Sequence, residues 1–202
     1  MAEGSTRERL LSAALDLFSV KGYDASSVDE IAESIGIKGP NIYKYFKGKQ
    51  GLYDELMRTC KEGYYKSMGI EARSRIKITS AAELKELSMK QIHFTLTNDT
   101  VKKLRKMLNI EQYRSEEMSH LTTYFQYGNL LDLYSNIFRK LIDRGVMLPG
   151  DPELLGLEYI APTALLIQVC DREPEKLAEV LDKSEKLIDL FIEKNFVPTE
   201  EQ

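Results

Sequence analysis

Apolar residues recur at helical spacing through almost the whole of this 202-residue chain, and no other feature constrains its fold as strongly. Residues three, four and seven positions apart share one side of an α-helix, so they form an apolar stripe that can be buried. The first such stripe consists of Leu10, Leu11, Ala14, Leu17 and Phe18. Alternating apolar and polar runs, which are typical of β-strands, do not compete with this pattern. The periodicity therefore predicts an all-α protein.

Short capping signals mark where the first helices begin and end. Ser5 with Glu8, and Ser27 with Glu30, have the spacing of capping boxes, in which each side chain bonds to the backbone of the other residue. Gly22 is predicted to end the first helix, because glycine adopts the left-handed cap conformation at no steric cost. The helix that follows Ser27 is then only about two turns long.

We expect two domains in this helical chain. Residues 1–66 would form a compact N-terminal unit of three helices, with a fourth helix at Gln50–Tyr65 that leads to the rest. The periodicity weakens over Gly69–Ser80 and resumes in a larger helical domain within residues 67–202. The helices expected there are Ala81–Leu96, Val101–Tyr113, Glu116–Arg144, Pro152–Cys170 and Pro174–Asn195.

The segment from Ser27 to Phe46 has the layout of a helix-turn-helix, two short helices joined by a tight turn at Gly36. In this motif the first helix braces on the DNA backbone and the second enters the major groove. The chain carries a net charge of −4, so any contact with DNA must come from a local basic patch. No acidic residue interrupts the run that contains Lys38, Lys44, Lys47 and Lys49. The alternative interpretation of these lysines is an ordinary solvated surface.

The stretch from Thr6 to Leu56 resembles the N-terminal DNA-binding domain of the TetR family of transcriptional regulators. In the family pattern, Ser or Thr often stands at the place of Lys38, Gly at that of Pro40 and Thr at that of Asn41. These positions lie on the predicted reading surface, so the departures concern the operator sequence. The residues that carry the resemblance are Leu10-Leu11, Ala13-Ala14, Leu17-Phe18, Gly22-Tyr23, Ser26-Ser27-Val28, Ile31-Ala32, Gly36-Ile37, Ile42-Tyr43, Tyr45-Phe46, Lys49 and Leu52.

The resemblance implies a set of DNA contacts. Ser27, at the start of the second helix, would bond a phosphate. Asn41 could bond adenine through its amide, and Pro40 could pack on a thymine methyl group. Tyr43, Lys44 and Lys49 would hold phosphates. The full expected set is Ser27, Lys38, Gly39, Pro40, Asn41, Tyr43, Lys44 and Lys49.

Aromatic and methionine residues populate the larger domain. Taken one by one, they are expected to pack in its core, but the family resemblance implies a cavity among these helices. Methionine and aromatic walls suit an apolar or aromatic ligand because they are polarizable and adaptable. The candidate effector pocket comprises Phe94, Met107, Tyr113, Tyr124, Phe125, Tyr134 and Phe138.

The stretch Leu154–Cys170 is apolar nearly all round, and a soluble monomer avoids exposing such a helix. We expect it to pair, with the helix that follows, into a symmetric four-helix dimer interface. The alternative is a deeply buried central helix in a monomer. At about 17 residues it is short of the ~20 needed for a membrane span, so no transmembrane helix is expected. The expected interface residues are Leu157, Ile160, Ala164, Leu165, Val180, Leu181, Ser184, Leu187, Ile188 and Phe191.

Catalytic chemistry is not expected from this sequence. The chain has two histidines, two cysteines and no glycine-rich phosphate loop, so no convergent set of nucleophile, base and orienting group is visible. Glu117 and His120 have the spacing of a di-iron ligand pair, but the second pair that such a site needs is missing. We expect neither a metal nor a cofactor.

These observations predict a cytoplasmic homodimer that binds double-stranded DNA and responds to a small apolar or aromatic effector. The resemblance favours a repressor on a pseudo-palindromic operator, with the helix at Gln50–Tyr65 transmitting the effector signal. Two alternatives remain open. One is a helix-turn-helix regulator controlled by a protein partner, without a small-molecule pocket. The other is an all-α enzyme without sequence-specific DNA binding.

Overall fold

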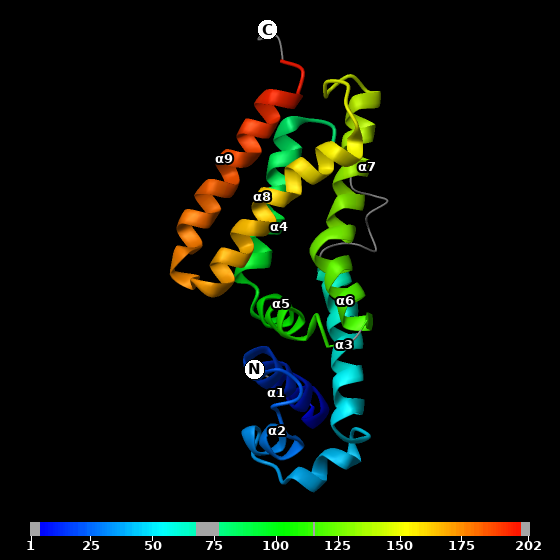
Figure 1. Ribbon diagram of the computed structural model, residues 1–202, viewed down its shortest axis with the longest axis vertical. Coiled ribbons are helices and arrows are strands. Elements are labelled where there is room, and N and C mark those ends of the chain that lie inside the picture. Colours follow the sequence, from blue (N-terminus) through cyan, green and yellow to red (C-terminus); the bar gives the residue numbers. More distant parts are fainter. Residues whose placement is uncertain (1–4, 68–76, 115, 199–202) are drawn as a thin grey trace. The chain divides into compact units, whose positions relative to one another are not determined.

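The computed structural model describes residues 5–67, 77–114 and 116–198, without the side chains of residues 60, 61 and 63–67. Within these ranges every regular element is a helix, and extended pairing is limited to one isolated bridge between Met147 and Phe196 (Figure 1). The prediction of an all-α protein is confirmed.

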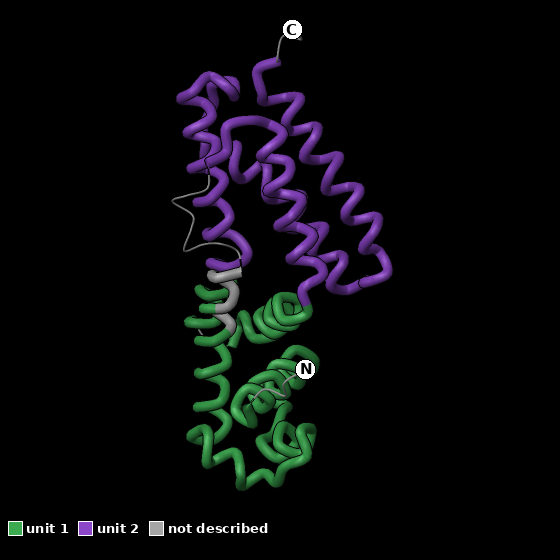
Figure 2. The backbone as a smooth tube through the Cα atoms, turned by 180° about the vertical axis from the view of Figure 1, so that it is seen from behind, with its two compact units in different colours: residues 1–71, 99–122 green, residues 72–98, 123–202 purple. Residues whose placement is uncertain are grey.

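The chain divides into two compact units (Figure 2). Unit 1 combines Met1–Glu71 with Asp99–Thr122, and unit 2 combines Ala72–Asn98 with Thr123–Gln202. A single boundary after residue 66 therefore does not describe the packing. The elements of unit 1 are α1 (Thr6–Lys21), α2 (Val28–Ser34), η1 (Gly39–Lys44), α3 (Gly48–Ser67), α5 (Asp99–Glu111) and α6 (Glu116–Thr123).

The predicted caps are present at the starts of α1 and α2. The Ser5 hydroxyl accepts the backbone N–H of Glu8, whose carboxylate accepts the N–H of Ser5 at 2.8 Å. Ser27 and Glu30 repeat this reciprocal pair at α2. Gly22 ends α1 with a φ of 78°, in the left-handed region that favours glycine.

The core of unit 1 explains why α5 belongs to it. Leu10, Ala14 and Phe18 of α1 are fully buried, and on α5 Met107 is fully buried as well. Lys103 of α5 also pairs with Asp16 of α1 at 2.6 Å. The apolar stripe of α5 thus packs on α1, because this burial removes the apolar surface of both helices from water.

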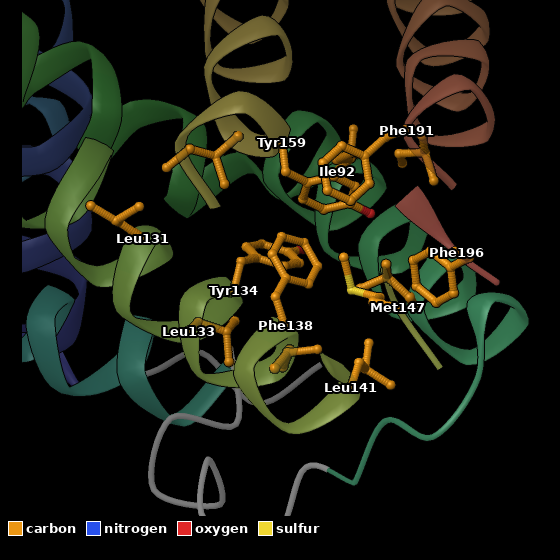
Figure 3. Packing of buried hydrophobic residues seen from close by; sticks show 14 of the residues in the cluster. Ile92, Leu131, Leu133, Tyr134, Phe138, Leu141, Met147, Tyr159, Phe191 and Phe196 are labelled. Atoms are coloured by element: carbon orange, nitrogen blue, oxygen red, sulfur yellow. The ribbon is translucent and has the colours of Figure 1, made fainter. Parts of the chain in front are cut away.

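Unit 2 is built around a cluster of aromatic rings (Figure 3). Phe191 stacks on Phe138 with 5.2 Å between ring centres and meets Tyr159 at 4.7 Å. The Ser88 hydroxyl lies 2.8 Å from that of Tyr159 and 3.1 Å from that of Tyr134. The elements of unit 2 are α4 (Ala81–Thr97), η3 (Tyr124–Gly128), α7 (Asn129–Asp143), α8 (Pro152–Arg172), η4 (Pro174–Lys176) and α9 (Leu177–Asn195).

Two helices of the later part of the chain differ from expectation. The single helix expected at Glu116–Arg144 is interrupted by a π-helical turn, η3, between α6 and α7. The helix α8 runs for 21 residues through Pro162, and a window within it is long and apolar enough, by length and composition alone, to cross a membrane. Only 22% of that window is buried inside the chain. The expected length of 17 residues was therefore too short.

Close packing of α7 and α8 depends on Gly156. A Cβ atom at this position would lie 2.8 Å from the Ser135 hydroxyl and 3.1 Å from a Leu131 methyl group. A larger residue at this position would therefore require the Ser135 hydroxyl and the Leu131 methyl group to shift.

Candidate nucleic-acid interface

The helix-turn-helix consists of α2, a turn at Gly36 and η1. Gly36 has a φ of 78°, and its N–H donates to the carbonyl of Glu33 at 2.9 Å, which turns the chain two residues after α2 ends at Ser34. Pro40 occupies the first turn of η1, as predicted, since that position needs no backbone donor. The segment is a 3₁₀-helix of six residues, where an α-helix was expected.

The inner face of η1 holds it against the rest of unit 1. Ile42 and Phe46 are buried, and the guanidinium of Arg7 lies 5.3 Å from the centre of the Phe46 ring. Gly39 is buried as well, and a Cβ atom there would overlap the Asp29 carboxylate of α2. The structure therefore corrects the expectation for Gly39: it permits close packing on α2 and does not lie on the outer face.

The outer face of η1 presents the other predicted reading residues. Lys38, Pro40 and Lys44 are exposed, Tyr43 is 67% exposed, and Asn41 is partly buried. Within the described part of the chain, the side chains of Lys38, Lys44 and Lys47 make no ion pair or hydrogen bond. Their charges can therefore meet phosphates without first breaking an internal interaction.

Ser27 is exposed, but its hydroxyl already serves the cap. It accepts the Glu30 N–H at 3.1 Å and donates to the Glu30 carboxylate at 3.0 Å. Hydrogen bonds from Lys21 and from Ser27 lower the pKa of Glu30 to about 2, so this carboxylate stays ionised. The predicted phosphate contact of Ser27 would have to share the hydroxyl with the cap.

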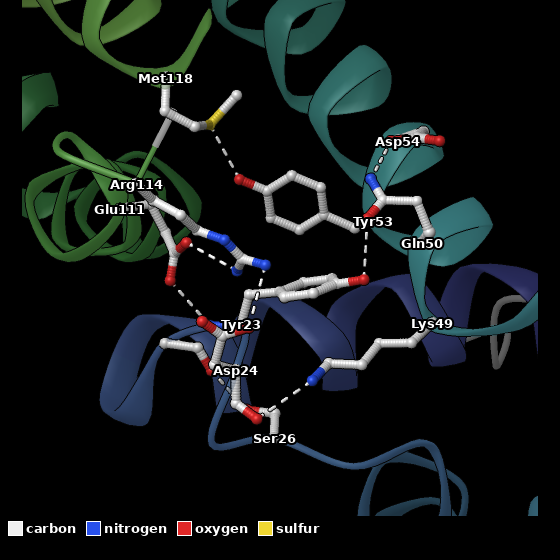
Figure 4. Close-up of polar contacts among 11 residues, drawn as sticks. Tyr23, Asp24, Ser26, Lys49, Gln50, Tyr53, Asp54, Glu111, Arg114 and Met118 are labelled. Carbon is white, nitrogen blue, oxygen red and sulfur yellow. Dashed lines mark hydrogen bonds and ion pairs between the residues drawn. The ribbon is translucent and has the colours of Figure 1, made fainter. Parts of the chain in front are cut away.

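Lys49 is held inside unit 1 (Figure 4). Its ammonium group lies 4.2 Å from the centre of the Tyr23 ring and donates to the carbonyl of Asp24 at 3.3 Å. A cation over an aromatic face is attracted by the ring quadrupole. Lys49 is thus engaged by the turn after α1, in contrast to the unpaired lysines of the outer face.

The other face of Tyr23 is covered by Arg114, whose guanidinium lies 4.1 Å from the ring centre. Arg114 pairs with Asp24 at 2.9 Å and with Glu111 at 3.0 Å. The buried Glu111 also accepts the backbone N–H of Tyr23 at 2.8 Å. We name Tyr23, Asp24, Lys49, Gln50, Glu111 and Arg114 the Tyr23 cluster.

Sequence reasoning missed most of the Tyr23 cluster. One signal was available, because Glu111 continues the apolar stripe of α5 that contains Leu104 and Leu108. A carboxylate on a buried helix face needs a partner. The identity of that partner, the turn after α1, could not be read from the spacing.

The predicted effector-pocket residues are divided between the two units. Tyr134 and Phe138 lie together in the unit 2 core, with 6.0 Å between ring centres. Tyr124 and Phe125 meet in η3 at 5.6 Å, and Phe94 lies on α4. Met107 and Tyr113 belong to unit 1, where Met107 is fully buried and Tyr113 is 90% exposed.

The predicted dimer residues separate into two groups. Ile160, Val180, Ser184, Ile188 and Phe191 are buried in the core of unit 2, so they offer no surface to a second chain, and their assignment to an interface is corrected. Leu157 and Leu165 are exposed, and Ala164, Leu181 and Leu187 are partly exposed.

The exposed apolar residues of α8 form a stripe along one side of the helix. The interface expected from the sequence included only part of this stripe. Leu154, Leu157, Ala161 and Leu165, spaced by three, four and four residues, are all exposed. Leu190 on α9 is 61% exposed. The signal was the spacing itself, since these positions share one side of a helix.

Metal-ligand geometry is not found in the described residues, where no group of three or more potential ligands converges. His120 lies 3.5 Å from Glu116, and both side chains are mostly exposed. Glu117 and His120 are exposed residues of α6.

Comparison with known proteins supports the reading of the N-terminal part. Residues 10–56 match the family model described as "Bacterial regulatory proteins, tetR family". The chain is 39% identical over 79 residues to the probable HTH-type transcriptional regulator YttP of Bacillus subtilis. It is 35% identical over 54 residues to IcaR of Staphylococcus aureus, named a negative transcriptional regulator of the biofilm operon icaADBC. These matches cover 39% and 27% of this chain, and 38% and 29% of the relatives.

Solved structures resemble the fold over nearly the whole chain. The SmeT–triclosan complex has a TM-score of 0.69 at 18% identity, covering 98% of this chain and 100% of that one. The fatty acid degradation regulator FadR of Bacillus halodurans has a TM-score of 0.68 at 16% identity, covering 95% and 97%. At such identities the likeness concerns the fold alone. The match shows that residues 10–56, which contain the helix-turn-helix, are similar to the DNA-binding part of the TetR family of bacterial regulatory proteins.

Proposed function

We propose that this protein is a cytoplasmic transcriptional repressor that binds a pseudo-palindromic operator as a homodimer and leaves it when a small apolar or aromatic molecule binds. The observation that carries the proposal is the outer face of η1, where Lys38 and Lys44 are exposed and unpaired among the described residues. Because the inner face is anchored by Ile42 and Phe46, this surface is rigid enough to enter a major groove.

The polar composition of that face supports sequence-specific reading. Asn41 offers an amide that can bond an adenine edge, and Pro40 an apolar surface that suits a thymine methyl group. Tyr43 and Lys44 flank them and can bond phosphates, which position the reading residues without specifying sequence.

The stripe on α8 supports a homodimer. Leu154 is 65% exposed and Leu165 61% exposed, an arrangement that is costly in water. The small buried share of α8 argues against a central helix in a monomer. A second copy, related by a two-fold axis, would cover the same stripe on both chains. The alternative is that a membrane, and not a second copy of the chain, covers this stripe.

The relatives support ligand-responsive repression. IcaR is named a negative regulator, SmeT is described as a repressor and has a structure with triclosan, and a regulator from Saccharomonospora viridis has one with choline. For the present chain we expect a coupling of about 1–3 kcal/mol between the binding of the effector and the binding of DNA. The alternative is that a protein partner, and not a small molecule, controls the binding of DNA.

Selection from randomised DNA with the purified full-length protein tests the proposal. We expect an enriched pseudo-palindrome whose half-sites lie about 34–36 Å apart, one helical turn of DNA. Failure to enrich any sequence would contradict it. If the selected operator is bound but no compound of an apolar and aromatic panel releases it, control by a protein partner replaces the small effector.

Sedimentation without detergent tests the dimer. Leu165→Glu should convert a dimer to a monomer, because it buries a charge in the interface. Leu148→Glu is the matched control, since Leu148 is also exposed but lies in the turn between α7 and α8. If the unchanged protein sediments as a monomer, the dimer is contradicted. The same holds if the unchanged protein stays in solution only when detergent is added.

A further inference from the structure

A cavity of about 540 Å³ lies within unit 1, between the start of α3 and α6. This volume is in the range of small-molecule sites, about 300–1,000 Å³. None of the pocket residues expected from the sequence lines it. Its walls instead include Tyr23 and Gln50 of the Tyr23 cluster, so it adjoins the element that holds Lys49 (Figure 4).

One side of the cavity is apolar and polarizable. Tyr53, Met57, Met118 and Leu121 form this side, and the Tyr53 hydroxyl donates to the sulfur of Met118 at 2.9 Å. Thioethers and aromatic rings make favourable contacts with aromatic or branched groups of many shapes. This wall suits the apolar body of a ligand rather than a sugar or a nucleotide.

The basic residues of the wall are already neutralised. Arg58 pairs with Glu55 at 2.6 Å and with Glu62 at 2.7 Å. Arg114 likewise faces the two carboxylates of the Tyr23 cluster. A carboxylate or phosphate on a ligand would therefore have to compete with four internal carboxylates for two guanidinium groups.

The acidic residues of the wall are not balanced in this way. Asp54 accepts one hydrogen bond from the amide of Gln50 at 2.7 Å. Glu117 is exposed and makes no ion pair or hydrogen bond with the residues that the structure describes. Among the side chains that the structure describes, these two leave an excess of negative charge at a cavity with an aromatic and thioether wall, which favours a cation.

We propose that this cavity binds a monovalent organic cation with aromatic or branched apolar groups. Its charge lies near Asp54 and Glu117, and its apolar part packs on Tyr53, Met57 and Met118. The inference rests on the proposed function as a ligand-responsive regulator, and it assigns the effector a site in the DNA-binding unit. Because Tyr23 and Gln50 form part of the wall, occupancy acts directly on the cluster that fixes the turn before α2.

Calorimetry on the full-length protein, without DNA, tests the ligand class. The probe is tetraphenylphosphonium, and tetraphenylborate is its matched anion of nearly equal size. We expect the cation to bind at least tenfold more tightly than the anion. Equal or tighter binding of the anion would overturn the proposal.

Charge removal tests the assigned carboxylates. Glu117→Gln should weaken tetraphenylphosphonium binding about tenfold, the effect of one unit charge at about 6 Å with an effective dielectric constant of about 40. Asp54→Asn should act in the same direction. Glu116→Gln is the matched control on α6 outside the wall and should leave binding unchanged. An unchanged affinity in both Glu117→Gln and Asp54→Asn would overturn the proposal.

Fluorescence locates the site, because the chain contains no tryptophan. Leu121→Trp places a reporter in the cavity wall, and Tyr127→Trp places a matched one in unit 2. Tetraphenylphosphonium should change the emission of the first only. A change confined to Tyr127→Trp would overturn the cavity site and leave the proposed ligand-responsive function intact. Operator selection, measured separately, reports on that function.

Discussion

Each unit contains an aromatic cluster, and the two clusters differ in what surrounds them. In unit 1, Phe18, Tyr23 and Tyr53 meet at 4.9–5.7 Å between ring centres, and charged groups cover both faces of Tyr23. In unit 2, the rings of Phe138, Tyr159 and Phe191 pack among apolar side chains. A ring held by charges can be released by a change in one charge, whereas a ring held by packing moves only if the core opens.

The two clusters also place their hydroxyl groups differently. In unit 2 the hydroxyl of Ser88 lies between those of Tyr134 and Tyr159, and Tyr134 donates to Gln91 at 3.0 Å. In unit 1 the Tyr23 hydroxyl donates to the exposed side chain of Gln50, at the start of α3, at 2.8 Å. The comparison indicates that unit 2 supplies a rigid scaffold and unit 1 the part that can respond.

The largest effect expected is on the packed cluster. Phe138→Ala should lower the free energy of unfolding by about 3–5 kcal/mol, because it removes a fully buried ring and leaves a cavity. Urea unfolding followed by circular dichroism measures this. Tyr113→Ala is the exposed control and should change it by less than about 0.5 kcal/mol. A loss below about 1 kcal/mol for Phe138→Ala would mean that the core can collapse around the gap.

The next effect concerns the charged cluster. Glu111→Ala should lower the free energy of unfolding by about 2–3 kcal/mol, because it leaves the Tyr23 N–H without its acceptor and Arg114 with Asp24 as its one remaining carboxylate partner in the Tyr23 cluster. Glu116→Ala, an exposed carboxylate on α6, should have little effect. If Glu111→Ala were as mild as Glu116→Ala, the Tyr23 cluster would not hold the turn after α1.

Alkaline pH should distinguish the buried tyrosines of unit 2. Burial raises the pKa of Tyr134 to about 12, above its ordinary value near 10, so the folded state disfavours its ionisation. The resulting stability is fully present below pH 10 and is lost as the pH rises through about 12. Tyr134→Phe should flatten this loss in unfolding measured from pH 9 to 12. An unchanged slope would show that Tyr134 does not control it.

Lys44 and Lys49 should differ in their effect on DNA binding, because one is exposed and unpaired among the described residues and the other lies on Tyr23. Lys44→Ala should weaken binding to all sequences alike and lower the salt slope by about one, because it removes one phosphate contact. Lys49→Ala should mainly reduce stability, by about 0.5–1 kcal/mol, since Lys49 lies on Tyr23. Filter binding at several salt concentrations measures the slopes. If the salt dependence of DNA binding changed more in Lys49→Ala than in Lys44→Ala, Lys49 would be a phosphate contact after all.

The smallest effect is expected at acid pH. The pKa of Glu30 is lowered to about 2 from 4.5, chiefly by its hydrogen bond with Lys21, so its contribution is present above about pH 4.5 and is lost as the pH falls toward 2. Glu30→Gln should therefore reduce the acid dependence of unfolding between these values. Glu33→Gln, also exposed on α2, is the control. Equal acid curves for both variants would contradict the assignment.

Much of the secondary structure could be predicted from local pattern. The caps at Ser5 and Ser27, the stop at Gly22 and the position of Pro40 all follow from backbone groups that residues a few positions apart must satisfy. The 3₁₀ form of η1 and the π-turn η3 could not be predicted, because the choice between neighbouring helical hydrogen-bond patterns depends on what each segment packs against.

The site was predicted less completely than the fold. Residue type and spacing placed Lys38 and Lys44 on an exposed face, and the structure agrees. Pro40, which the family resemblance placed on the same face, is exposed as well. Spacing also suggested that Gly39 can face outward, but the structure buries it against Asp29. The contact of Lys49 with the Tyr23 ring was not foreseen. Their partners, Asp29 and Tyr23, come from other elements of unit 1.

The sequence by itself determined that this protein is helical, where most of its helices begin, and that the segment from Ser27 to Phe46 is a helix-turn-helix of the TetR type. Only the tertiary structure decided that α5 joins the DNA-binding unit, that Glu111 and Arg114 grip Tyr23, and which side of α8 stays exposed. The physical reason is that periodicity and caps are local properties of a few successive residues. They say that a helix face will be buried, and the packing of distant segments decides what covers it.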